Sequence, residues 1–165
     1  MLRCTVAIFA VTLLLAGVAG VAYSHCEIPC GIYNDQTRVS LLKEHVTTIE
    51  KSMSQLEALS GKGDPQSINQ IVRWVENKES HANEIQEIVT QYFLTQRVKA
   101  KPAGDAGHGK YVTQTTTLHQ MLVAAMKCKQ TVDKKHCAEL RRLIDQFSNA
   151  YFSKADLDHM KQHKH

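Results

Sequence analysis

Residues 25–33, His-Cys-Glu-Ile-Pro-Cys-Gly-Ile-Tyr, concentrate side chains that bind soft and borderline metal ions. His25 offers an imidazole, and Cys26 and Cys30 offer two thiols. If the chain is cut after Ser24, His25 gains a free α-amine as a further donor. We call residues 25–33 the hook segment, and its residue types predict a metal site.

The donor types of the hook segment favour nickel. Ligand type and geometry must select the metal, because raw affinity favours copper. The α-amine of His25, with an unperturbed pKa of about 7.7–8.0, loses its proton easily to a metal. Together with the deprotonated Cys26 amide and the thiolates of Cys26 and Cys30, it completes a square plane of nitrogen and sulfur donors, which suits Ni(II). The anionic donors also stabilise the oxidised metal, with the His25 imidazole as an axial ligand.

The pattern His-Cys-x-x-Pro-Cys-Gly-x-Tyr at a processed amino terminus resembles the nickel-binding hook of the nickel-containing superoxide dismutases. Residues 45–53, His-Val-Thr-Thr-Ile-Glu-Lys-Ser-Met, and residues 91–97, Gln-Tyr-Phe-Leu-Thr-Gln-Arg, are also similar to that family. The resemblance implies a nickel ion as cofactor and superoxide anion as substrate. It implies disproportionation to dioxygen and hydrogen peroxide by Ni(II)/Ni(III) cycling, in a homo-oligomer that is a hexamer in the family.

The resemblance also implies roles for individual residues. His25, Cys26 and Cys30 correspond to the nickel ligands. Tyr33 corresponds to a tyrosine beside the open face of the metal, and Tyr92 to a second tyrosine of the substrate pocket. By residue type alone, Tyr92 is at least as consistent with a core residue whose hydroxyl lies at the edge of the core.

The groups that hold the axial imidazole in the family, an arginine in helix two and a glutamate in helix one, have no counterpart here. The corresponding stretch of the second helix offers His81, and the first helix offers Ser40, Leu41 or Leu42. A lone helical histidine is more often a surface or core residue than a functional partner. The role of His81 therefore stays open.

Residues 1–24 have the pattern of a secretory signal peptide. Arg3 precedes an almost continuous apolar run, and Ala22 and Ser24 place small residues where signal peptidase accepts them. The run is short for a membrane-spanning helix, which needs about 20 residues. We therefore expect signal peptidase to release a mature chain that begins at His25 and is exported to a periplasmic or extracellular location. A nickel-loading protein is a further candidate partner there.

Composition excludes several other classes of function. The formal net charge of +4 over 165 residues is mild, which argues against nucleic-acid binding. Removal of the first 24 residues leaves enough chain for one domain with a real core. The sequence contains no GxSxG, phosphate-loop or HExxH motif.

Residues 34–152 predict an all-α fold, an antiparallel four-helix bundle that carries the hook segment at its amino terminus. Apolar residues recur at intervals of three and four, the period of a packed helix. Gly61 and Gly63 end the first helix, and Asp64 followed by Pro65 predicts a capped start for the second. The expected helices cover residues 35–59, 65–99, 111–129 and 133–151.

The second helix carries both an apolar stripe and an interruption. We expect its inner face to consist of Ile68, Ile71, Val75, Ala82, Ile85, Val89 and Tyr92. Lys78 and Glu79 interrupt this stripe. Their polar side chains could face another subunit, the metal site or solvent.

Two features of the carboxyl-terminal half have alternative interpretations. Cys128 and Cys137, nine residues apart, either form a disulfide or are small buried residues. Residues 153–165 are polar and rich in histidine and lysine, which favours a frayed tail.

Other functions would use parts of the same pattern. An exported copper- or nickel-binding protein without turnover could use the same hook segment, and this is the main alternative. A copper monooxygenase also uses an amino-terminal histidine, but such enzymes resemble β-sandwiches. A thiol oxidoreductase is disfavoured, because three residues separate Cys26 from Cys30 and no βαβ pattern follows.

The position of the mature terminus is the first testable prediction. We expect the exported protein to begin at His25, because only a cut after Ser24 frees the His25 amine for a metal. Intact mass or Edman sequencing of the exported protein measures this directly. A mature chain that begins at any other residue lacks the amine ligand and contradicts the nickel assignment.

Overall fold

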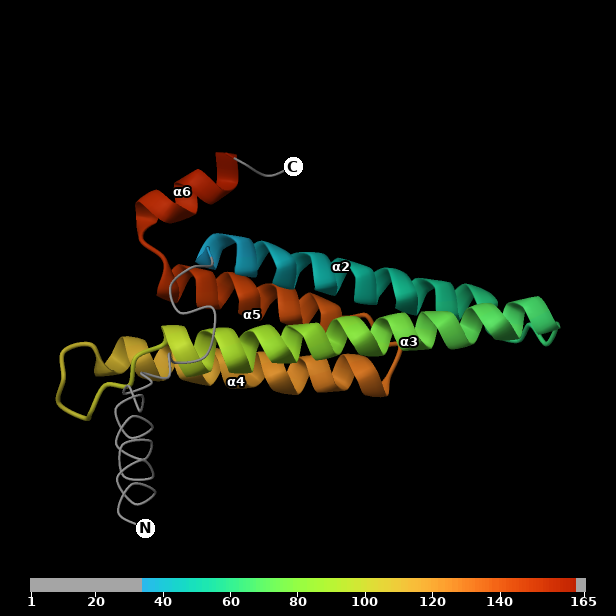
Figure 1. Cartoon of the computed structure of the whole chain (residues 1–165), viewed down its shortest axis with the longest axis horizontal. Helices are drawn as coiled ribbons and strands as arrows, with labels where there is room; N and C mark the ends of the chain where they lie inside the picture. The colour runs from blue at the N-terminus through green and yellow to red at the C-terminus, as the bar shows by residue number, and fades with distance from the viewer. Residues whose placement is uncertain (1–33, 163–165) are drawn as a thin grey trace, which may run out of the picture. The chain divides into compact units, whose positions relative to one another are not determined.

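The computed structural model describes residues 34–162, which lie in the larger of two units of the chain, Gly31–His165. Every regular element in this range is a helix (Figure 1), and η1 is a π-helix. The helices are α2 (Asp35–Leu59), α3 (Pro65–Glu87), η1 (Ile88–Arg97), α4 (His108–Gln130), α5 (Lys135–Tyr151) and α6 (Lys154–Gln162).

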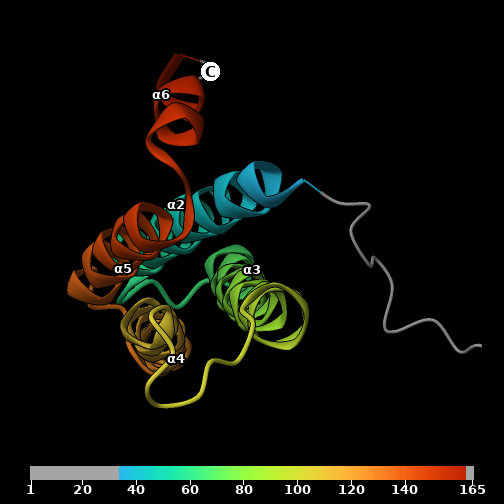
Figure 2. The same ribbon diagram turned by 90° about the vertical axis from the view of Figure 1, so that its left-hand side faces the viewer.

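Four of these helices form an antiparallel bundle. α2 packs against α3 and α5, and α4 packs against the same two helices. Figure 2 views them nearly end-on and shows the four in a ring around one core. The predicted all-α four-helix bundle is therefore confirmed. Among residues 34–162, no helix is both long and apolar enough to cross a membrane.

The helix starts follow from local capping. The Asn34 side chain accepts a hydrogen bond from the Thr37 backbone N–H at 3.0 Å, which satisfies a donor that the first turn of α2 leaves open. Asp64 does the same for the Ser67 N–H at 3.0 Å, and Pro65 occupies the first turn of α3. The predicted bounds of the first helix and the predicted start of the second are confirmed.

The core is made of the apolar stripes of α2, α4 and α5 together with the second half of the α3–η1 helix. Its largest fully buried side chains include Phe93 and Phe147, whose ring centroids lie 4.8 Å apart in an edge-on contact. In α2, the predicted stripe is buried as expected at Val39, Leu42, Val46, Ile49 and Met53.

The prediction of a buried inner face is wrong for the first half of the second helix. Ile68 is 51% exposed and Val75 is 40% exposed, and the neighbouring Val72 is 60% exposed. In Figure 1 the first turns of α3 extend past the ends of α4 and α5, so that α2 alone covers them. The periodicity predicted a helix correctly but could not show how far its neighbours reach.

Lys78 interrupts the apolar stripe of α3 but faces neither solvent nor an open surface. Its side chain is buried, with 3% exposed, and its Nζ donates to the backbone carbonyls of Cys128, at 2.8 Å, and Lys129. It also pairs with the carboxylate of Glu79 at 3.1 Å. The last carbonyls of α4 have no partners within their own helix, and Lys78 supplies them with donors. Lys78 thereby joins α3 to the end of α4.

The other helix ends differ slightly from the prediction. α4 begins three residues earlier than expected, at His108. α5 begins at Lys135, because Asp133 stays outside the helix and accepts from the Lys135 N–H at 3.0 Å. Beyond α5, residues 154–162 form a further helix that the sequence analysis did not predict, and α6 turns away from α5 in both views (Figure 1, Figure 2).

The role of Lys78 predicts a stability effect. Lys78→Met keeps the length of the side chain but leaves the two α4 carbonyls without their donor, and we expect a loss of about 2–3 kcal/mol in the free energy of unfolding. Lys51 is exposed on α2, and Lys51→Met is the matched control, with an expected change within about 0.5 kcal/mol. Urea unfolding followed by circular dichroism measures both. Equal stability of the two variants would show that Lys78 does not hold the end of α4.

Candidate functional site

The predicted metal ligands His25, Cys26 and Cys30, and the predicted pocket residue Tyr33, lie outside the described residues. Their roles therefore stay predictions. The described chain begins at Asn34, directly after the hook segment. The candidate site is built here from what lies at this end of the bundle.

Tyr92 is the one predicted site residue that the structure describes. It lies in η1 with 6% of its surface exposed, and its hydroxyl donates to Asp35 Oδ1. Asp35 is the first residue of α2 and stands two positions after Tyr33 in the chain. The scaffold therefore holds the Tyr92 hydroxyl beside the residue where the hook segment joins the bundle.

Asp35 binds three side chains at once. Besides Tyr92, the Tyr151 hydroxyl donates to Asp35 Oδ2 at 2.8 Å, and Arg97 Nη2 donates to the same oxygen at 2.7 Å. These four residues, which we call the Asp35 cluster, come from α2, η1 and α5. Phe93 and Phe147 pack against the Tyr151 ring of the cluster, with the Phe147 and Tyr151 rings stacked at 5.2 Å. The aromatic rings fix the side-chain positions of the cluster.

The winding of η1 explains how Tyr92 and Arg97 reach one carboxylate. In an α-helix, at 3.6 residues per turn, side chains five residues apart point about 140° away from each other. In a π-helix the backbone bonds to the fifth residue along, so side chains five apart lie one turn apart on the same side. The Val98 N–H, which donates to the Phe93 carbonyl at 2.8 Å, shows this spacing. The sequence analysis predicted a continuous helix here but not its wider turns.

The hydrogen bonds of the cluster set its protonation. Burial raises the pKa of Asp35, but hydrogen bonds from Arg97, Tyr92 and Tyr151 outweigh burial and leave that pKa below its usual value. Burial and the bond to Asp35 raise the pKa of Tyr151 to about 12 and shift the pKa of Tyr92 upward as well. At neutral pH the cluster is therefore one carboxylate, one guanidinium and two neutral phenols.

This protonation state limits what Tyr92 can do chemically. Its hydroxyl proton is donated to Asp35 Oδ1, so Tyr92 does not offer that proton to another acceptor. The guanidinium carbons of Arg38 and Arg97 lie 5.6 Å and 5.9 Å from the centre of the Tyr92 ring. Both guanidinium groups therefore lie against the Tyr92 ring, and Arg97 is paired with the Asp35 carboxylate at 2.7 Å.

His81, whose role was left open, has a partner in the scaffold. Its Nδ1 lies 2.7 Å from Nδ1 of His45 on α2, so one imidazole donates and the other accepts. Burial and the neighbouring His81 lower the pKa of His45, although Glu84 and Glu44 oppose this shift. No group of three or more histidine, cysteine or acidic side chains among residues 34–162 could hold a metal ion. The histidine pair thus joins α2 to α3.

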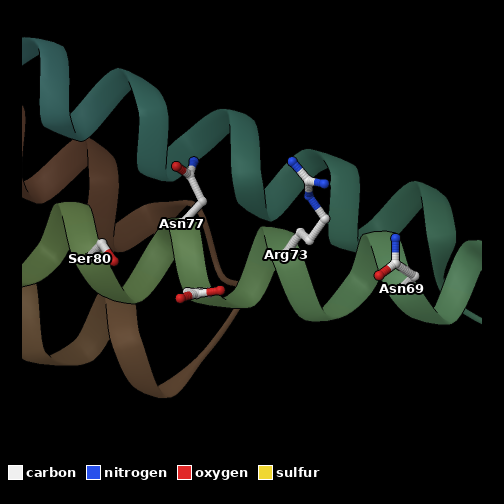
Figure 3. A pocket seen from close by; sticks show the side chains of 5 residues that line it. Asn69, Arg73, Asn77 and Ser80 are labelled. Atoms are coloured by element: carbon white, nitrogen blue, oxygen red, sulfur yellow. The ribbon is translucent and has the colours of Figure 1, made fainter.

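A polar groove runs along the first half of α3. Asn69, Arg73, Asn77 and Ser80 line it together with Glu76 (Figure 3). Asn77 also donates to the Ser52 hydroxyl at 3.0 Å, which ties the groove to α2. None of the predicted site residues lines this groove.

Three residues of the cluster were missed as functional candidates. Asp35 and Tyr151 were predicted only as the first residue of one expected helix and the last residue of another. Arg97 ends the stretch 91–97 that carried the family resemblance. The sequence did offer one signal for Asp35: it is an acidic residue that stands two positions after the last residue of the hook segment.

Comparison with known proteins gives one match. The family model described as nickel-containing superoxide dismutase matches residues 20–155, which include the hook segment and all four helices of the bundle. No curated protein and no solved structure matches the chain.

Asp35→Asn tests how strongly the cluster holds the bundle. The amide cannot accept from three donors, so we expect a loss of about 2–3 kcal/mol in the free energy of unfolding at pH 7. The pKa of Asp35 is lower folded than unfolded, so its contribution is present above the unfolded value of about 3.9 and is lost as the pH falls through the folded value. The difference between wild type and variant should therefore shrink below about pH 4.

Thermal unfolding over a pH series measures this difference. Asp145→Asn is the matched control, because Asp145 forms an exposed pair with Lys43 at 2.7 Å. Exposed ion pairs of this kind contribute about 0–1 kcal/mol to the free energy of unfolding, so the control should lose little stability. A loss for Asp35→Asn that is no larger than the loss for Asp145→Asn, or that does not change with pH, would contradict the role of the Asp35 carboxylate.

Proposed function

The chain belongs to the nickel-containing superoxide dismutase family, and from that premise we propose that it disproportionates superoxide to dioxygen and hydrogen peroxide. The reaction takes place at the processed amino terminus, with superoxide anion as substrate and a nickel ion as cofactor. The observation that carries the proposal is that one family model spans both the hook segment and the bundle.

The donor set of the hook segment fits nickel. His25 provides an amine and an imidazole, Cys26 provides an amide nitrogen and a thiolate, and Cys30 provides a second thiolate. Nitrogen and anionic sulfur donors of this kind suit a metal that must be stable in two oxidation states. When bound, nickel supplies one-electron exchange between its +2 and +3 states.

The residues of the bundle serve the substrate. Superoxide is an anion, and we place its approach beside the Tyr92 ring, where the guanidinium groups of Arg38 and Arg97 lie. Tyr92 contributes the shape of the pocket through its ring, because its own proton is held by Asp35 and superoxide has no proton to donate. We assign Tyr33 to the same pocket by its place in the hook segment. Formation of peroxide consumes protons, and the ionised Asp35 cannot supply them, so they come from solvent or from the hook segment.

Assembly and maturation complete the proposal. We propose a homo-oligomer, a hexamer by family resemblance. The exposed side chains Ile68, Val72 and Val75 recur along one side of α3, and apolar surface of this kind is typical of subunit contacts. Signal peptidase would free His25 during export to a periplasmic or extracellular location, and a nickel-loading protein is a candidate partner.

The alternative is an exported copper- or nickel-binding protein without turnover. Such a protein would use the same donors but would have no use for a tyrosine and two arginines at the junction with the hook segment. The Asp35 cluster therefore favours the enzyme.

The thiolates provide the test. We expect Cys26→Ser and Cys30→Ser each to abolish nickel binding and superoxide turnover, because each substitution removes an anionic sulfur donor. Elemental analysis gives nickel per chain, pulse radiolysis gives the rate of superoxide decay, and circular dichroism should show an unchanged helical content.

Cys128→Ala is the matched control, because it removes a thiol from the core and not from the hook segment. We expect it to keep both nickel and turnover. Turnover that survives Cys26→Ser or Cys30→Ser would contradict the proposal, whereas wild-type protein that binds metal without turnover would support the carrier.

A further inference from the structure

Three sulfur atoms lie together in the core at one end of the bundle. Cys128 Sγ and Cys137 Sγ are 4.0 Å apart, and Cys137 Sγ is 3.7 Å from Met53 Sδ. All three side chains are fully buried, and both cysteines are free thiols. The sulfurs of Cys128 and Cys137 are thus in contact without being bonded.

The direction of the two hydrogen bonds can be deduced. A thioether has no proton, so Cys137 must donate to Met53. Cys137 then has only lone pairs for its other neighbour, and Cys128 donates to Cys137. This bond lowers the pKa of the Cys137 thiol, whereas the same bond and burial raise the pKa of Cys128. Cys137 is therefore the thiol that ionises first, while Cys128 keeps its proton and donates it to the Cys137 sulfur.

Charged groups around the pair support an anion at Cys137. Lys78 Nζ lies 2.8 Å from the carbonyl of Cys128, inside the same buried region. Glu50 and Arg141, which pair with each other at 2.6 Å, act in opposite directions: Glu50 raises the pKa of Cys137 and Arg141 lowers it. A thiolate formed at Cys137 would be stabilised by the buried lysine.

Both cysteines are close to helix ends. Cys128 stands two residues before the end of α4, and Cys137 is the third residue of α5. The connection between them, residues 131–134, is mostly exposed. Helix ends open locally at little cost compared with global unfolding, and such opening admits a small neutral oxidant.

We propose that Cys128 and Cys137 are a redox-modification site that closes to an intramolecular disulfide when the chain meets hydrogen peroxide. The identity of the oxidant rests on the proposed function, whose product is hydrogen peroxide. The sulfurs must approach from 4.0 Å to a bond of about 2.0 Å. Small rotations of both side chains together with local opening of the helix ends bring them into bonding distance.

The chemistry balances without a further reactant. The Cys137 thiolate attacks one peroxide oxygen, the O–O bond breaks, and hydroxide leaves as water with the proton that Cys137 released. Cys137 is then a sulfenic acid. The Cys128 sulfur attacks the Cys137 sulfur, the S–O bond breaks, and a second water leaves with the Cys128 proton. Two thiols lose two electrons in all, and one peroxide is reduced to two waters.

The test uses the full-length chain with Cys4, Cys26 and Cys30 all replaced by serine, so that the pair holds its only thiols. Peroxide is added directly, and the result therefore does not depend on whether the chain turns over superoxide. We expect alkylatable thiols to fall from two to none, and the mass to fall by about 2 Da. Peptide mapping should link residues 128 and 137, and dithiothreitol should restore both thiols.

Single-thiol variants on the same background test the order of events. With Cys128→Ser, Cys137 remains and should gain oxygen in steps of about 16 Da. With Cys137→Ser, Cys128 should react at least several-fold more slowly. Two thiols that stay alkylatable, oxygen added to the paired protein instead of mass lost, or a disulfide between two chains would each overturn the proposal.

A second arm separates this proposal from the proposed function. Nickel-loaded wild-type protein that consumes superoxide should form the same link by itself, and catalase should prevent it. A link formed with added peroxide but not when superoxide is supplied to the nickel-loaded protein would leave the site intact and count against the proposed function. A link absent in both arms would overturn the site alone.

Discussion

One carboxylate joins three helices at the end of the bundle where the hook segment enters. Asp35 belongs to the first turn of α2, yet its hydrogen-bond donors come from η1 and α5. An acceptor this poorly exposed to water must be matched by donors, and here two phenols and a guanidinium match it. The cost of burying the charge is offset only while all three are present, so the positions of Tyr92, Arg97 and Tyr151 depend on one another.

The proposed function divides the work between two parts of the chain. In that proposal, the hook segment binds the metal and exchanges electrons through it. The bundle would contribute position, through a phenol whose proton is already donated to Asp35. Within the bundle, the core is apolar, and the histidine pair and Lys78 join its helices.

The sequence predicted the features that depend on local rules. The bounds of α2 follow from its apolar spacing and the break at Gly61, and the start of α3 follows from Asp64 and Pro65. The hook segment stands out by residue type alone. What it could not predict depends on distant parts of the chain. Tyr151 and Asp35 are separated by 116 positions, and the exposure of Ile68 depends on where α4 and α5 end.

The π-helix η1 also bears on how sequences of this kind should be compared. In an ordinary α-helix, side chains four residues apart share a face, whereas in η1 those five apart do so. A chain with one residue deleted between Tyr92 and Arg97 could therefore present the same two side chains to Asp35 from plain α-helical turns. An alignment would record that deletion as a gap inside a helix. The gap would then mark a change of winding that leaves the geometry of the carboxylate and its donors intact.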